Sequence, residues 1–153
     1  MTAPVRKPTR KEIDLYYKTH RSSFFAPERV HVLQIVKNIY KDSDRHNARL
    51  FLEQAERDLR SGMSFSDAAD RYSDCGGNGG DLGWFTRDVM VEEFEEVVFN
   101  LQPGQVSPIF ETRFGLHIAL LLEKRPAGIR PFSEVYDEIA DALYQSKLEK
   151  IGE

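Results

Sequence analysis

Two side chains of this sequence are suited to covalent chemistry, the thiol of Cys75 and the imidazole of His117. A thiol next to an imidazole is the pair that cysteine hydrolases use, because the histidine takes the proton from the nucleophile. The residues around Cys75 do not form a recognisable nucleophile turn, and no partner that would orient His117 is evident. A cysteine hydrolase is therefore disfavoured.

A glycine-rich loop follows Cys75 directly. Four glycines lie in the five positions 76–80, and the sequence Asp-Leu-Gly-Trp-Phe comes next, at 81–85. Glycine costs roughly 0.5–1 kcal/mol relative to alanine in regular structure, so the cluster indicates positive φ angles or the close approach of another group. No Gly-Lys-Ser/Thr follows, so the loop is not a phosphate cradle. We expect a site beside this loop.

The composition bounds the class of protein. With 153 residues and 41% hydrophobic content, the chain is predicted to form one domain plus an arm. A net charge of −4 argues against nucleic-acid binding, and a single cysteine excludes an intramolecular disulfide and a multi-cysteine zinc site. No apolar run is long enough for direct membrane insertion, and residues 1–8 lack the apolar region of a signal peptide. We expect a soluble chain, cytoplasmic as given or a fragment of an exported bacterial protein.

Periodicity and capping signals predict the elements that must position these residues. Thr9 and Glu12 form a capping-box pattern, and Ser64 is a second N-cap candidate. We expect helices at residues 9–22, 45–60, 64–72, 91–101 and 132–150, and strands at 30–36, 106–110 and 116–123, with a short strand after the glycine loop. This order predicts an α+β fold with a small, mostly antiparallel sheet.

Five motifs in this order resemble those of the parvulin-type peptidyl-prolyl cis-trans isomerases. They lie at residues 73–75 (SDC), 79–85 (GGDLGWF), 90–94 (MVEEF), 101–107 (LQPGQVS) and 114–118 (FGLHI). The helices before and after them resemble those that flank this domain in bacterial chaperone-isomerases. The resemblance implies an N-terminal tail and helix at 1–28, a parvulin-like isomerase domain at 29–125 and a C-terminal helical arm at 126–153.

The resemblance also implies an activity, the rotation of X-Pro bonds in unfolded or folding client proteins without a cofactor or metal. Amide resonance sets a barrier of about 18–20 kcal/mol to this rotation, and an apolar, water-poor pocket that grips the proline ring can lower it. Residues implied in substrate binding are Leu82, Met90, Phe94 and Phe114. Residues implied in the polar, catalytic cluster are Cys75, His117, Thr112 and Gln34.

Gln34 departs from the family pattern, which has a first histidine at this position. His31 cannot replace it, because a residue three positions away along a strand lies on the opposite face. Glutamine has a donor and an acceptor, so it can make the hydrogen bonds of a neutral imidazole without titrating. Asp81 is expected to brace its loop.

Three further interpretations concern what binds. A non-catalytic parvulin-like chaperone module that holds extended client segments is the main alternative, and Gln34 favours it. Phosphate recognition by a basic cluster is disfavoured, because the candidates lie on a short loop that is typical of a solvated surface; they are Lys37, Lys41 and Arg45. An acidic rim suggests a preference for clients with Lys or Arg near the proline; it comprises Asp88, Glu92, Glu93, Glu95 and Glu96. The sequence leaves the oligomeric state open.

Overall fold

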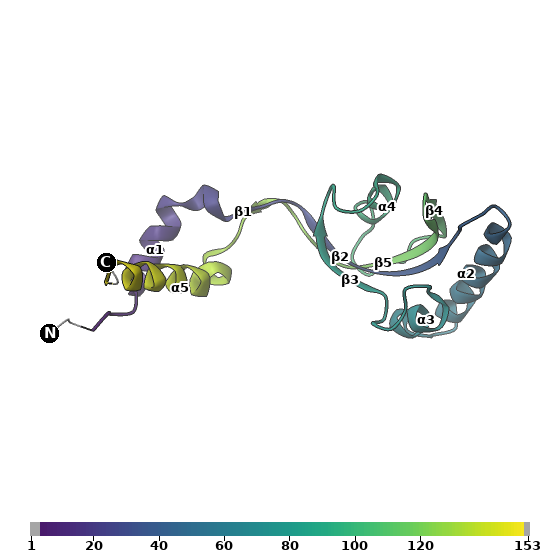
Figure 1. The fold of residues 1–153 in the computed structure, drawn as a ribbon, viewed down its shortest axis with the longest axis horizontal. Coiled ribbons are helices and arrows are strands. Elements are labelled where there is room, and N and C mark those ends of the chain that lie inside the picture. Colours follow the sequence, from purple (N-terminus) through teal and green to yellow (C-terminus); the bar gives the residue numbers. More distant parts are fainter. Residues whose placement is uncertain (1–3, 152–153) are drawn as a thin grey trace. The chain divides into compact units, whose positions relative to one another are not determined.

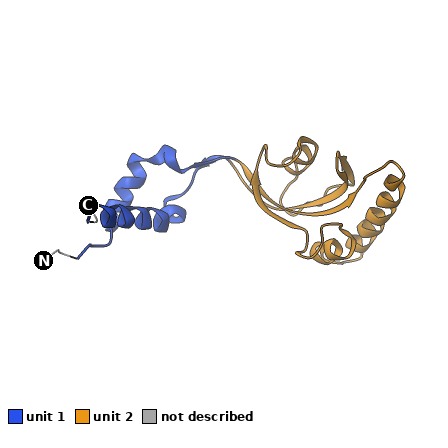
Figure 2. Cartoon of the chain, viewed as in Figure 1, with its two compact units in different colours: residues 1–27, 127–153 blue, residues 28–126 orange. Residues whose placement is uncertain are grey.

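The computed structural model describes residues 4–151, which divide into two compact units (Figure 2). Unit 2 comprises Glu28–Pro126, and unit 1 combines the residues before it with those after it. Each unit has its own buried core, so each is described separately below. No helix among the described residues is long and apolar enough to cross a membrane.

Unit 1 pairs an N-terminal with a C-terminal helix, α1 (Arg10–Thr19) with α5 (Phe132–Ile151). The predicted capping box is confirmed, because the Glu12 N–H donates to Thr9 Oγ1 and the Thr9 N–H donates to the Glu12 side chain. The predicted helix is too long, since α1 ends at Thr19 and a 3-10 turn, η1 (Arg21–Phe24), follows. The core of unit 1 contains Ile13, Phe24, Val135 and Ile139.

A short antiparallel ribbon that the sequence analysis missed completes unit 1. Its strands are β1 (Phe25–Ala26) and β6 (Gly128–Ile129). The Tyr17 hydroxyl donates to the Arg130 carbonyl at 2.7 Å, which ties α1 to the segment after β6. Two-residue strands carry no periodicity, which is why the pattern of the sequence does not reveal them.

Unit 2 contains a four-stranded antiparallel sheet in the order β3-β2-β5-β4. The strands are β2 (Arg29–Asn38), β3 (Asp81–Thr86), β4 (Phe110–Thr112) and β5 (Gly115–Arg125). Helices α2 (Asp44–Arg60) and α3 (Phe65–Tyr72) cover one face, and α4 (Glu92–Val98) covers the other (Figure 1). The predicted α+β class with an antiparallel sheet and flanking helices is therefore confirmed.

Strand alternation divides the core of unit 2 between the two faces. On the face of α2 and α3, the central strands contribute Leu33, Ile35, Leu116 and Ile118. On the face of α4 they contribute Val30, Val32, Ala119 and Leu121. The intervening positions Gln34 and His117 therefore belong to the α4 face, by the same period of two.

Two predicted elements of unit 2 differ from the structure. The bounds expected for a strand at 106–110 are wrong. Val106 makes only an isolated bridge to Leu120, and the strand of this region, β4, begins at Phe110. Pro108, which has no N–H to donate, lies in the interval between them. The helix expected at 91–101 is shorter, since α4 ends at Val98.

Candidate active site

An open, mostly apolar pocket of about 120 Å³ lies between α4 and the sheet. Its lining residues are Gln34, Leu82, Met90, Val91, Phe94, Phe114 and His117. Cavities of about 150 Å³ admit a benzene ring, so the space suits one small apolar ring. The four residues expected to bind substrate thus line the same pocket as Gln34 and His117.

Two aromatic rings pack against His117, which lines the pocket. The Phe94 ring lies 5.4 Å from the imidazole in an edge-on arrangement, and the Phe110 ring stacks on it at 5.3 Å with an angle of 18°. Phe94 and His117 are both buried, at 3% and 5% exposure. Phe110 was missed by the sequence analysis, although its place two residues before Thr112 puts it on the same strand face.

A polar chain joins His117 to both of its predicted partners. The side-chain oxygen of Gln34 lies 3.1 Å from His117 Nδ1, and Thr112 Oγ1 lies 2.7 Å from Nε2. Because a carbonyl oxygen only accepts, Nδ1 carries the proton and donates to Gln34. Nε2 then accepts from the Thr112 hydroxyl, whose oxygen accepts from the Phe114 N–H at 3.2 Å. Both ring nitrogens of a neutral imidazole are therefore hydrogen-bonded.

The register of the sheet explains this convergence. Val36 is opposite His117 and Gln34 is opposite Ala119, so Gln34 and His117 are diagonal neighbours on one face. On the other side, Thr112 is opposite Gly115, which makes Thr112 the second diagonal neighbour of His117. Two strand pairs therefore bring one residue from each of three strands together.

Burial keeps the imidazole uncharged. Desolvation lowers the pKa of His117 from 6.5 to about 4, so the ring is neutral near pH 7. The side chain is 5% exposed and no cation or carboxylate shares the cluster. The cluster can therefore orient hydrogen bonds, and it does not supply a charged group.

Cys75, the fourth predicted member of the polar cluster, is placed differently. The residue is exposed and is not among those that line the pocket. Its N–H donates to Ser73 Oγ at 3.3 Å, within the loop before the glycines. The structure thus brings Gln34, Thr112 and His117 together without the thiol.

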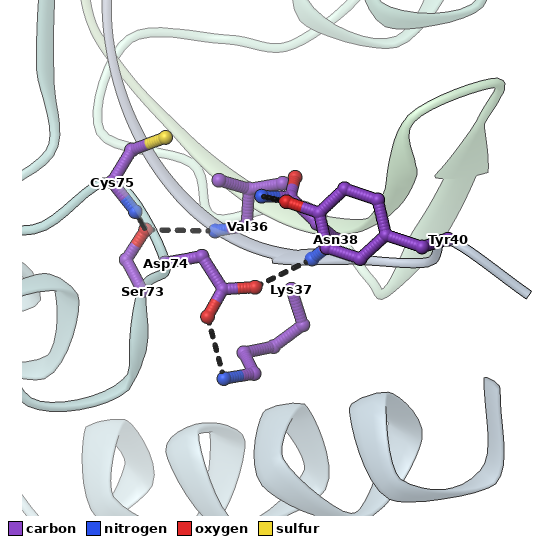
Figure 3. A network of polar contacts seen from close by, with 7 residues as sticks. All are labelled: Val36, Lys37, Asn38, Tyr40, Ser73, Asp74 and Cys75. Carbon is purple, nitrogen blue, oxygen red and sulfur yellow. Dashed lines mark hydrogen bonds and ion pairs between the residues drawn. The ribbon is translucent and has the colours of Figure 1, made fainter. Parts of the chain in front are cut away.

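The loop that contains Cys75 covers an open edge of β2 (Figure 3). Strand β3 pairs with β2 only as far as Leu33, and the loop supplies partners beyond that point. The Val36 N–H donates to Ser73 Oγ at 3.1 Å, and the Asn38 N–H donates to the Asp74 carboxylate at 2.7 Å. Unpaired strand edges are templates for aggregation, so this cover protects the sheet.

The glycines allow the loop to approach β2 closely, as the sequence predicts. The Gln34 N–H donates to the Gly80 carbonyl at 2.9 Å. Gly80 has φ +76°, and a Cβ atom there would lie 2.2 Å from the Gln34 carbonyl oxygen. The approaching group is therefore the strand that carries Gln34.

Asp81 braces the turn that positions Leu82, as predicted. Its carboxylate accepts from the Gly83 N–H at 2.7 Å and from His31 Nε2 at 2.8 Å. The hydrogen bond from Gly83, followed by that from His31, lowers the pKa of Asp81. His31 thus serves the turn next to the pocket and has no place in the polar cluster.

Two of the three basic residues considered for phosphate recognition are paired with carboxylates. Lys37 pairs with Asp74, and Arg45 pairs with Glu111. The acidic rim also needs correction, because Glu95 is buried. Among residues 4–151, no group of three or more His, Cys, Asp or Glu side chains is arranged to hold a metal ion.

Comparison with known proteins gives the family. The family model of the PPIC-type PPIase domain (Rotamase) matches residues 31–123, more than half of the chain. The foldase protein PrsA of Geobacillus sp. (strain WCH70) is 37% identical over 146 residues, which cover 94% of this chain and 47% of that relative. The chaperone SurA of Aromatoleum aromaticum is 45% identical over 75 residues, which cover 48% of this chain and 17% of that relative.

A solved structure agrees with the sequence relatives. A crystal structure of a PpiC-type peptidyl-prolyl cis-trans isomerase domain gives a TM-score of 0.61 at 26% identity, covering 66% of this chain and 94% of that one. The chain spans about half the length of the PrsA relatives that it matches. Taken with the five ordered motifs and the antiparallel sheet, these matches place the chain in the parvulin-type, or PPIC-type, peptidyl-prolyl cis-trans isomerase family.

Proposed function

We propose that unit 2 catalyses cis-trans isomerisation of X-Pro bonds in extended segments of unfolded or folding proteins. The observation that carries this proposal is the pocket itself, whose apolar walls open beside a neutral, fully hydrogen-bonded imidazole. Leu82, Met90 and Phe94 form the walls that grip the proline ring, and Phe114 lies at its edge. No bond is made or broken, so no cofactor takes part in this reaction.

The proposed mechanism lowers the cost of twisting the amide. The planar amide is stabilised by a charge-separated resonance form, which is favoured by water and disfavoured in a dry pocket. Holding the ring while the preceding carbonyl rotates stabilises the twisted state over the planar one, which is the condition for catalysis. His117 faces this space as a neutral ring, so it shapes the pocket and orients hydrogen bonds without moving a proton.

Gln34 has a specific part in this proposal. Its side-chain oxygen accepts from Nδ1 of His117 and thereby fixes the tautomer in which Nε2 accepts from Thr112. An amide performs this role at any pH, because it does not titrate. Cys75 remains a predicted member of the site, and the mechanism does not require it.

Exchange spectroscopy on a short X-Pro peptide tests the proposal. Met90→Ala and Phe94→Ala are expected to reduce catalytic efficiency by about tenfold or more, because each removes apolar contacts with the ring. Val89→Ala is the matched control, since this neighbouring side chain is 61% exposed and does not line the pocket. Equal efficiency in all three variants would refute the assignment of the pocket.

A non-catalytic chaperone module is the second candidate function. Gln34 in place of the family's first histidine favours it, and the relatives include proteins named as a chaperone and as foldases. The same pocket would then hold a proline-containing client segment without accelerating its isomerisation. Peptide binding with no exchange above the uncatalysed rate would support this candidate against the first.

A further inference from the structure

Two glutamates of α4 flank Phe94 in the sequence and hydrogen-bond to two different segments that carry pocket residues. Successive residues of a helix are separated by about 100°, so Glu93 and Glu95 project to either side of Phe94. We infer that Glu93 and Glu95 are positioning residues that keep the pocket at the width needed for a proline ring. Glu93 holds the turn at residues 113–114, the Phe114 lip, and Glu95 holds the segment at residues 88–90, the Met90 lip. This inference rests on the proposed function, since it assigns the residues that set the geometry of that site.

Glu95 holds the Met90 lip. Its carboxylate accepts from three consecutive backbone N–H groups, those of Asp88 at 2.7 Å, Val89 at 3.1 Å and Met90 at 2.9 Å. The side chain is buried, at 6% exposure, so water does not compete for these three hydrogen bonds. The last of them fixes the backbone of the residue whose side chain lines the pocket.

The segment that Glu95 holds is strained. Asp88 has φ +71°, which is the left-handed conformation that a residue with a side chain rarely adopts. Such a conformation persists only where the surroundings impose it. The Glu95 carboxylate supplies that constraint, because it accepts from the N–H of Asp88 itself and from the two residues that follow.

Glu93 holds the Phe114 lip. Its carboxylate accepts from Arg113 at three atoms, the backbone N at 3.1 Å, Nε at 3.1 Å and Nη2 at 2.7 Å. Arg113 lies between Thr112 and Phe114 in the turn from β4 to β5. The pair therefore ties α4 to the turn that carries a pocket residue and a hydroxyl of the polar cluster.

The Glu93–Arg113 pair and the Glu95 hydrogen bonds differ in their exposure, so they should respond differently to salt. Arg113 is 63% exposed and Glu93 36% exposed, so salt screens this pair and it contributes little to stability. The Glu95 bonds are buried and are screened much less. Salt should therefore loosen the Phe114 lip and leave the Met90 lip unchanged.

The test uses the full chain and a neutral X-Pro peptide, with Glu123→Gln and Glu149→Gln as controls. These two glutamates are exposed, lie on β5 and α5, and do not line the pocket. We expect Glu95→Gln to raise KM, or the peptide Kd, by about tenfold with a smaller change in kcat, as loss of a buried charge-assisted hydrogen bond predicts. Glu93→Gln should raise it by about threefold, because an exposed ion pair contributes less. The controls should match wild type.

Methyl NMR of Met90 provides a readout that does not depend on catalysis. Glu95→Gln should shift or broaden the Met90 signal, whereas Glu93→Gln should not. High salt should weaken peptide binding by wild type toward the level of Glu93→Gln, and should leave that variant unchanged. In a double-mutant cycle, Arg113→Gln should add little to the effect of Glu93→Gln on peptide binding, because both changes break the same pair.

Specific results would overturn the inference. It fails if Glu93→Gln and Glu95→Gln fold, bind and turn over as the controls do, or if they lose stability alone with affinity and the Met90 signal unchanged. If Glu95→Gln does not fold, the exposed Glu93–Arg113 pair decides the outcome. If wild type neither binds nor isomerises the peptide, the proposed function fails, while the Met90 spectrum still reports whether Glu95 holds its lip.

Discussion

Acidification from pH 6.5 to pH 4 should destabilise unit 2 through His117. The unfolded chain takes up a proton on this imidazole near its ordinary pKa of 6.5, whereas burial lowers the pKa of the folded state to about 4. Above pH 6.5 the ring is neutral in both states and the stability is fully present. Between the two values only the unfolded state binds the proton, so stability falls as the pH falls.

The expected loss follows from the two pKa values. Each pH unit in the interval contributes about 1.4 kcal/mol, so the free energy of unfolding should fall by about 3 kcal/mol by pH 4. Because His117 is only 5% exposed, solvent screening does not reduce this figure greatly. A change of this size is a large fraction of the stability of a typical domain.

Urea unfolding followed by fluorescence measures this loss. Trp84 is the single tryptophan of the chain and lies in unit 2, so it reports on the unit that contains the site. Wild type and His117→Gln are compared at several pH values between 4 and 7, which cancels the contribution of the carboxylates that both share. Between pH 7 and pH 4, the free energy of unfolding of the variant should fall by about 3 kcal/mol less than that of wild type. Identical pH dependences would refute a buried, neutral His117.

Three further predictions concern the loop, the polar cluster and the ligand. In urea unfolding, Gly80→Ala should destabilise unit 2 by about 3 kcal/mol or more, because its Cβ atom would clash with the Gln34 carbonyl. Gly83→Ala should cost about 1 kcal/mol, because Gly83 also has a positive φ angle but its Cβ atom would enter open space. Equal costs would contradict the role of Gly80. Gln34→His should preserve or raise turnover in exchange spectroscopy. Loss of turnover in this variant would show that the amide of Gln34 is required. Lys-X-Pro peptides should bind more tightly than Glu-X-Pro peptides at low salt and equally at high salt, and equal affinities at low salt would remove the acidic-rim hypothesis.

The elements that make the site were predictable because they follow local rules. The family resemblance assigned Gln34 and His117 to one cluster, and the period of two in β2 and β5 explains why they share a face. The spacing of four placed Met90 and Phe94 on one side of α4 and the turn that leads into it. The Thr9 capping box and the Ser64 N-cap were also readable, since each depends on residues three positions apart. Ordered motifs identified the family for the same reason.

Other features depend on contacts that no local pattern encodes. Glu95 is expected at the surface, because an acidic side chain in a helix is normally exposed. Its burial is explained by the three backbone N–H groups that donate to its carboxylate, which no local pattern reveals. The pairing of α1 with α5 joins segments more than a hundred residues apart. The position of Cys75 depends on how its loop follows the edge of β2, which the motif alone does not specify.

The most direct test of the central claim is exchange spectroscopy on a short X-Pro peptide with a small amount of the full chain. Uncatalysed isomerisation takes tens to hundreds of seconds at 25 °C. Wild type should give cis-trans exchange peaks on a much shorter timescale, and Phe94→Ala should abolish them. Tight binding of the peptide by wild type with no exchange faster than in the free peptide would show that unit 2 is not an isomerase.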